Sequence, residues 1–136
     1  MSESIGFEVE LSEPYEAALE RVQAALANEG FGVLTRIDVS ETFKKKLDLD
    51  FRPYAILGAC NPKLASRALQ SRPDAGLLLP CNVTVEATEA GGSLVRIVDP
   101  EQMMKAGGVE HDQVLDEVGR EARQRLARVA EALAAG

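Results

Sequence analysis

The two cysteines of the chain are the residues with the most distinctive chemistry. Each is followed by an asparagine, in the segments GACNP (residues 58–62) and LLPCN (residues 78–82), and each segment closes an apolar run typical of a buried strand. Thiols can act as nucleophiles, redox pairs or metal ligands. The twenty residues between Cys60 and Cys81 match neither a Cys-x-x-Cys motif nor the closely spaced ligand pairs of zinc sites. The spacing therefore predicts no metal site.

The two thiols could still meet in space if their strands are neighbours in a sheet. Cys60 and Cys81 would then form a thiol pair, or one thiol would lie near the helix start expected at Asn61, whose dipole favours thiolate. The alternative is that both cysteines serve as small buried hydrophobic residues, which is the common role of a free cysteine. We favour burial, and we retain Cys81 as the residue to test for thiol chemistry.

Three polar residues offer further candidates for a binding or catalytic role. Asn61 precedes a proline, which predicts a helix cap, and the cap with the first helical amides could hold an anion. Asp38 ends a predicted strand and could join a carboxylate pair, although such aspartates often bond turn backbone. His111 is the only histidine, so any Ser-His-Asp or Cys-His catalysis would need it. Its place near a helix start is typical of a solvated residue. We assign no catalytic residue and name Asp38, Asn61 and Cys81 as candidate ligand-binding residues.

The apolar pattern predicts the elements that position these side chains. Residues 6–11 alternate as a strand does, and residues 12–28 have helical spacing that ends at Gly30. The last helix, expected over residues 109–135, has an apolar face. Further strands are expected at residues 31–39, 52–60, 77–87 and 94–98, short helices at 40–47 and 61–70, and a loop or short turn at 101–108. This order predicts an α+β fold, with a mainly antiparallel sheet and helices packed on one face. No repeat or linker divides the chain, so residues 1–136 are expected to form one domain.

Composition excludes several classes of function. The net charge is −7, aromatic residues make up 4% and Trp is absent, which disfavours binding to nucleic acid or anionic membranes. No stretch approaches the roughly 20 apolar residues of a membrane span. The N-terminal residues are acidic where a secretory signal is basic. We therefore expect a cytoplasmic protein with reduced thiols.

The order of four segments resembles a known family. These segments are EGFGVL (29–34), ID (37–38), YAILGACNP (54–62) and LLLPCNV (77–83), and together they resemble the bacterial family called domain of unknown function 302 over about residues 7–133. The positions that match the family pattern are Gly30, Phe31, Asp38, Asn61, Pro62, Leu79, Pro80 and Cys81, whereas Cys60 lies beside the pattern.

The resemblance implies a β-α-β(4)-α order similar to the fold of TATA-binding protein, and a homodimer with an exchanged helix. It implies no reaction and no cofactor. Three functions remain open. The first is a homodimeric module that binds a small apolar or anionic molecule near Asp38, Asn61 and Cys81. The second is a structural or interaction protein that dimerises through the apolar face of the last helix at Leu115, Val118, Leu126 and Val129. The third is a thiol-dependent enzyme or redox protein that uses Cys81, and we place it last.

Overall fold

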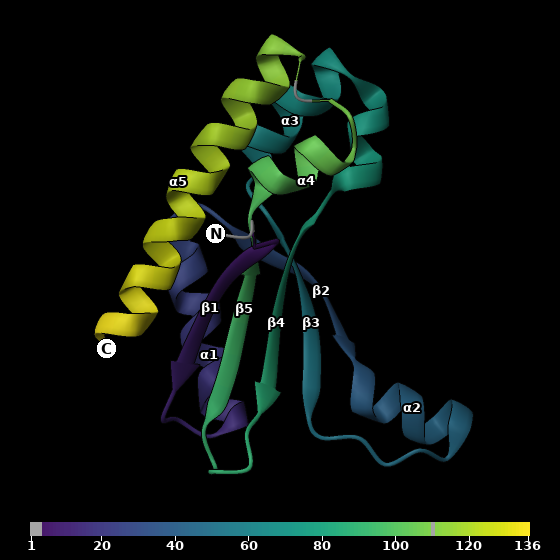
Figure 1. The fold of residues 1–136 in the computed structure, drawn as a ribbon, viewed down its shortest axis with the longest axis vertical. Helices are drawn as coiled ribbons and strands as arrows, with labels where there is room; N and C mark the ends of the chain where they lie inside the picture. Colours follow the sequence, from purple (N-terminus) through teal and green to yellow (C-terminus); the bar gives the residue numbers. More distant parts are fainter. Residues whose placement is uncertain (1–3, 110) are drawn as a thin grey trace.

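Five antiparallel strands form one sheet in the order β1-β5-β4-β3-β2. The structure is a computed structural model that describes residues 4–109 and 111–136. Its strands are β1 (Gly6–Leu11), β2 (Gly32–Asp38), β3 (Tyr54–Cys60), β4 (Cys81–Ala87) and β5 (Ser93–Val98). Its helices are α1 (Tyr15–Asn28), α2 (Val39–Leu47), α3 (Pro62–Ser71), α4 (Pro100–Ala106) and α5 (Gln113–Ala135), with a 3-10 helix η1 (Pro73–Leu78) before β4. The predicted α+β class and antiparallel sheet are confirmed (Figure 1).

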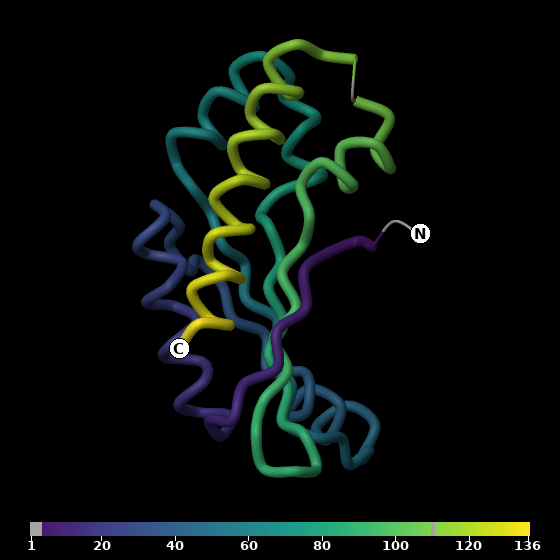
Figure 2. The backbone as a smooth tube through the Cα atoms, turned by 60° about the vertical axis from the view of Figure 1, so that its left-hand side comes forward, coloured from purple at the N-terminus to yellow at the C-terminus, as the bar shows by residue number. Residues whose placement is uncertain are grey.

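The sheet has one covered face and one open face. Side chains alternate across a strand, so in β1 Val9 and Leu11 are buried while Glu8 and Glu10 are exposed. Helices α1 and α5 lie on the same side of the sheet (Figure 2). Helix α2 lies on the other side, beyond the end of β2, and buries none of its residues. We call the uncovered side of the sheet the open face.

Helix α1 ends where its sequence predicts. Its buried residues, Ala18, Leu19, Val22 and Leu26, recur at helical spacing and pack into the core. Gly30 follows with a φ of +83°, and its N–H and that of Phe31 bond back to the last turn. The start differs from the expected Ser12 cap, because Pro14 is the capping residue and no side chain caps this end. Proline has no N–H, so it fits just ahead of the first turn.

The long last helix is confirmed, but it starts later than expected. Helix α5 begins at Gln113, because the Asp112 side chain caps it by accepting a hydrogen bond from the Leu115 backbone N–H at 3.0 Å. The residues of its apolar face, among them Val118 and Val129, are buried in the core of the same chain. The dimer-forming face suggested by the sequence is therefore used for the fold of the single chain.

The strand expected at residues 77–87 starts only at Cys81. The preceding apolar residues belong to η1, where Leu77 is 88% exposed, and the Leu79–Pro80 peptide bond is cis. Proline cannot donate to a strand ladder, so regular pairing begins after it. Cys81 thus opens a strand, which corrects the expectation that both cysteines close one.

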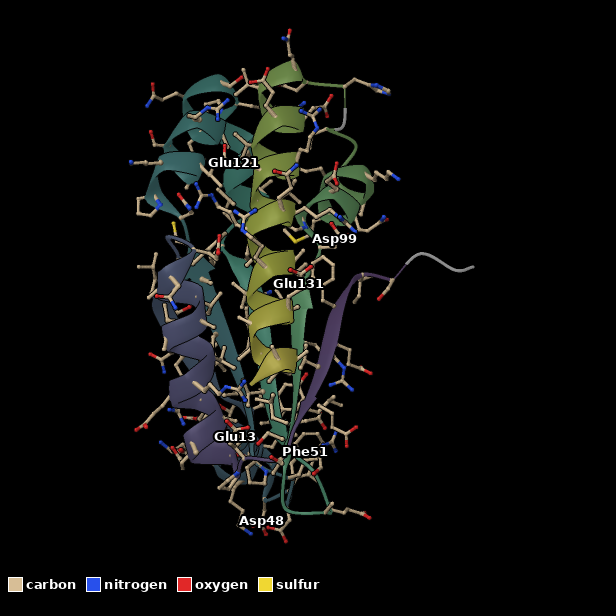
Figure 3. All side chains as sticks on the ribbon, turned by 90° about the vertical axis from the view of Figure 1, so that its left-hand side faces the viewer. Glu13, Asp48, Phe51, Asp99, Glu121 and Glu131 are labelled. Atoms are coloured by element: carbon tan, nitrogen blue, oxygen red, sulfur yellow. The ribbon has the colours of Figure 1, made fainter. Side chains whose placement is uncertain are left out.

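The segment expected to be a loop at residues 101–108 contains helix α4. The Asp99 carboxylate accepts one hydrogen bond from the Glu101 backbone N–H at 2.9 Å, which caps α4, and another from Arg123 Nε of α5 at 3.0 Å. Figure 3 shows Asp99 beside α5. A cap and a contact with a distant helix therefore stabilise a helix that is too short to be evident from periodicity.

Candidate functional site

Cys60 and Cys81 lie at the same end of the sheet. Cys60 is the last residue of β3 and Cys81 the first of β4, and Ala59 is paired directly with Cys81 in the antiparallel ladder. Both thiols are free. Because neighbours along a strand point to opposite faces, the Cβ of Cys81 is on the helix side with that of Ala59, and the Cβ of Cys60 is on the open face. The cysteines are adjacent in the sheet, and their Cβ atoms are on opposite faces of it.

The Cys81 thiol is buried and protonated at neutral pH. Its residue is 7% exposed, and burial raises the pKa of the thiol to about 11, with a further contribution from Cys60. Because the thiolate is the nucleophilic form, a pKa this high makes the thiol unreactive near pH 7. This environment disfavours Cys81 as a catalytic nucleophile.

Asn61 has a structural role that explains its identity. Its Oδ1 accepts a hydrogen bond from the Leu64 backbone N–H at 3.2 Å and caps α3, as the sequence predicts. The residue is buried at the junction with α1, where a Cβ on Gly30 would lie 3.0 Å from the Asn61 Nδ2 atom. Gly30 therefore provides both a positive φ and the space for the Asn61 amide.

Asp38 lies far from the other two candidate ligand-binding residues. In the β2–β3 ladder Gly32 pairs with Cys60, whereas Asp38 pairs with Ala55 at the opposite end. Six residues of extended strand span about 20 Å. Asp38 forms an ion pair with Arg36 at 2.9 Å. The structure thus places Asn61 and Cys81 near one end of the sheet and Asp38 near the other, and His111 is exposed in the turn before α5.

A small cavity lies between this end of the sheet and helices α3, α4 and α5. Its volume is about 30 Å³, and both cysteines and Asn61 are among its lining residues. Sites for organic ligands have volumes of roughly 300–1,000 Å³, whereas one water needs about 10–15 Å³. The cavity therefore fits one or two water-sized groups, and it does not fit an organic molecule.

A larger groove, which the sequence did not indicate, lies on the open face. It has a volume of about 460 Å³ and is bordered by Tyr54, Asn82, Thr84, Arg96 and Val98 among others. The Thr84 hydroxyl is buried there and has no hydrogen-bond partner among the described residues. Native structures satisfy the large majority of such groups, so an unpaired one calls for an explanation. The only sequence signal is the alternation of Asn82, Thr84 and Glu86 along β4.

Ion pairs fix the charged residues beside this groove. The Glu86 side chain is 8% exposed and accepts hydrogen bonds from Arg96 Nη1 and Arg52 Nε, while Arg96 Nε donates to Glu8 at 2.9 Å. Burial alone would raise the pKa of Glu86, but the bonds from Arg96 and Arg52 outweigh burial and leave the pKa below its usual value. Two arginines and two glutamates thus balance in charge along this face.

The arrangement is an α+β domain with one helix-covered face and one open face that carries a groove. The family model described as domain of unknown function DUF302 matches residues 7–133, so the chain belongs to this family, as its motifs predict. A similar solved structure is the crystal structure of an uncharacterized conserved protein DUF302 from Bacillus stearothermophilus. It is 30% identical, covers 96% of this chain and 99% of its own, and superposes with a TM-score of 0.84. None of the curated proteins matches the chain.

Two features are absent from the described residues. None of the helices in this part of the chain is long and apolar enough to cross a bilayer. Within the same residues, no three or more His, Cys, Asp and Glu side chains gather where they could hold a metal ion.

Proposed function

We propose that this protein is a small-molecule-binding module whose ligand occupies the groove on the open face. The carrying observation is the Thr84 hydroxyl, which is buried and unpaired at a groove of about 460 Å³. That volume falls within the range of known ligand sites. A ligand that hydrogen-bonds to Thr84 would remove a desolvation cost of about 1–3 kcal/mol that the unliganded protein bears.

The groove favours a neutral ligand with an apolar body and one polar group. Arg96 is already paired with Glu8 and Glu86, so no unmatched charge faces the groove from this network. Val98 contributes apolar surface, and Thr84 offers a hydroxyl as donor and acceptor. This proposal keeps a binding function but moves the ligand away from Asp38, Asn61 and Cys81. Because the Cys81 thiol is protonated near pH 7, a binding function of the protein is favoured over thiol-dependent catalysis.

Fragment binding followed by NMR tests the proposal. The probes are benzamide and benzyl alcohol, each an apolar ring with one neutral polar group, added to ¹⁵N-labelled protein. We expect amide shifts concentrated on β4 and β5 around Thr84, and loss of these shifts in Thr84→Val. Thr42→Val, which changes a threonine on α2 outside the groove, is the matched control and should behave as wild type. Shifts scattered over the surface, or unchanged in Thr84→Val, would contradict the proposal.

We propose further that the module is a homodimer assembled through the β2–α2 arm, defined as residues 32–49. Helix α2 buries no residue, and apolar side chains stay exposed along the arm at Leu34, Ile37, Leu47 and Leu49. Clustered exposed apolar residues are typical of an interaction surface. Burying them against a second molecule would supply hydrophobic free energy that the isolated chain lacks.

Charge complementarity supports a second copy of the chain as the partner. The last turn of α2 carries three lysines, of which Lys45 and Lys46 have no ion-pair partner among the described residues. The rest of the molecule is acidic enough to give a net charge of −7, and Glu10 on β1 is exposed with no ion-pair partner among the described residues. A basic arm on one copy therefore matches the acidic surface of another.

Sedimentation equilibrium tests the dimer. Wild type should sediment as a dimer at micromolar concentration, and the double variant Ile37→Ser/Leu47→Ser should sediment as a folded monomer. Leu77→Ser is the matched control, because Leu77 is an even more exposed apolar residue but lies outside the arm. A monomeric wild type, or a dimer that survives the double substitution, would exclude this interface.

Two free cysteines and the acidic composition support a cytoplasmic location for the assembly.

A further inference from the structure

Four of the five sulfur-containing residues of the chain line a single small cavity. The chain has two cysteines and three methionines, and the cavity of about 30 Å³ described above is lined by Cys60, Cys81, Met103 and Met104. We call it the sulfur cavity. These residues come from three segments of the chain, the end of β3, the start of β4 and helix α4. The fold therefore brings residues that carry soft donor atoms to the wall of one cavity.

The packing of α4 against α5 holds its methionines at the sulfur cavity. Met104 is buried, and opposite it α5 has Gly119, where a Cβ would lie 3.5 Å from Met104 Cγ. The Asp99 cap and its bond to Arg123 anchor α4 to α5. Helix α4 is thus held against α5 at its N-terminal cap and at Met104, which keeps Met103 and Met104 at the cavity although methionine side chains are flexible.

The lining offers no charged side chain to a hard metal ion. No Asp, Glu, His, Lys or Arg is among the residues that line the sulfur cavity, and Asn61 Oδ1 is engaged in the α3 cap. Thiolate and thioether ligands select Cu(I), whereas carboxylate, carbonyl and water ligands suit magnesium and calcium. A monovalent ion bound to one thiolate has zero net charge, which reduces the cost of burying it among apolar side chains.

We propose that the sulfur cavity binds one monovalent soft metal ion, Cu(I), through the thiolate of Cys81 and the thioethers of Met103 and Met104. Binding forms three Cu–S bonds, releases the Cys81 thiol proton to solvent and changes no oxidation state. The cavity holds one or two water-sized groups, so it accepts a single dehydrated ion. Cys60 lines the cavity too, but we do not assign it as a ligand, because strand alternation places its Cβ on the face of the sheet opposite to that of Cys81.

Competition with a chromophoric chelator tests this site. The full chain is titrated without oxygen against the Cu(I) complex of bicinchoninate, and we expect the wild type to withdraw one equivalent of Cu(I). Cys81→Ser should lose this competition, and Cys60→Ser, the matched control, should retain it. Met103→Leu and Met104→Leu should each weaken it, because leucine conserves volume but supplies no donor.

Thermal unfolding gives an independent readout. One equivalent of Cu(I) should raise the Tm of wild type and of Cys60→Ser, because a ligand of the native state stabilises it, while Mg²⁺ should leave the Tm unchanged. If Cys81→Ser does not fold, Met104→Leu keeps the test valid. The proposal is overturned if wild type withdraws no Cu(I), if Cys81→Ser or the methionine variants bind as wild type does, or if Cys60→Ser loses binding to the same extent as Cys81→Ser.

Discussion

Thr84 lies directly opposite Arg96 in the β4–β5 ladder, yet the Arg96 guanidinium bonds to Glu8 and Glu86 and leaves the Thr84 hydroxyl without a partner among the described residues. Thr84 and Arg96 are cross-strand neighbours, but Arg96 donates its hydrogen bonds to carboxylates instead of to the Thr84 hydroxyl. The arginine completes an ion-pair network, and the buried hydroxyl of Thr84, a residue that borders the groove, stays unpaired. The binding proposal depends on this division.

Replacing Thr84 with valine should stabilise the protein in the absence of ligand. Valine has nearly the same shape but no hydroxyl, so the substitution removes an unpaired buried polar group, and we expect a gain of about 1 kcal/mol. Urea denaturation of wild type and Thr84→Val measures this difference. A loss of stability of similar size would mean that the hydroxyl has a partner in solution, and the argument from an unpaired group would fail.

Glu86→Gln should destabilise the fold by about 1–3 kcal/mol at pH 7, because it removes the charged acceptor of Arg52 and Arg96. The folded-state pKa of Glu86 is lowered, so its stabilisation is present above the unfolded-state pKa, near 4.5, and is lost as the pH falls through the folded-state value. The difference between variant and wild type should therefore shrink in acid. Chemical denaturation from pH 7 to pH 3 measures it.

Glu10→Gln is the control for this experiment, because Glu10 is exposed on the open face and has no ion-pair partner among the described residues. Its effect should stay within about 0.5 kcal/mol at every pH. A Glu86→Gln effect that does not change with pH would contradict the role assigned to its ionised form.

Cys81 should resist alkylation until the protein is strongly alkaline or unfolded. The variant Cys60→Ser leaves Cys81 as the only thiol, so iodoacetamide labelling followed by mass spectrometry reports on it alone. Because its pKa is about 11, the thiolate fraction and the labelling rate should rise about tenfold per pH unit between pH 7 and pH 10. Fast labelling of the native protein at pH 7 would restore a thiol-dependent function as a candidate.

Asn61→Ala should cost about 1 kcal/mol by removing the cap of α3. Asn61→Asp keeps an acceptor oxygen at the same place and should retain most of the stability. Thermal unfolding of the two variants separates capping from any other role of the residue. Equal losses in both would show that the buried amide group, rather than the cap, determines the identity of this residue.

Local patterns in the sequence predict the elements that make their own contacts. Residues 6–11 alternate strictly, and β1 has these same bounds. The sequence predicts a start of β4 that is too early, because Leu77 and Leu78 have the apolar character of strand residues although they belong to a 3-10 helix. Helix α4 is not evident from the sequence, because its anchoring contact joins Asp99 to Arg123, 24 residues away, and no local pattern encodes it.

The candidate site follows the same rule, because only its local contacts can be predicted from the sequence. Capping by Asn61 was predictable because it involves neighbouring residues, whereas the groove is assembled from β1, β3, β4 and β5 and requires knowledge of strand order. The grouping of Asp38 with Asn61 assumed that strand ends converge. In an antiparallel sheet they alternate, so the two residues lie at opposite ends.

The affinity of the groove for its best neutral probe, compared among wild type, Thr84→Val and Thr42→Val, tests the binding proposal most directly. NMR titration gives the three dissociation constants under one set of conditions. A hydrogen bond of about 1–1.5 kcal/mol predicts that Thr84→Val binds roughly tenfold more weakly, while Thr42→Val matches wild type. Equal dissociation constants for all three proteins would contradict the proposal that Thr84 and its groove form the ligand site.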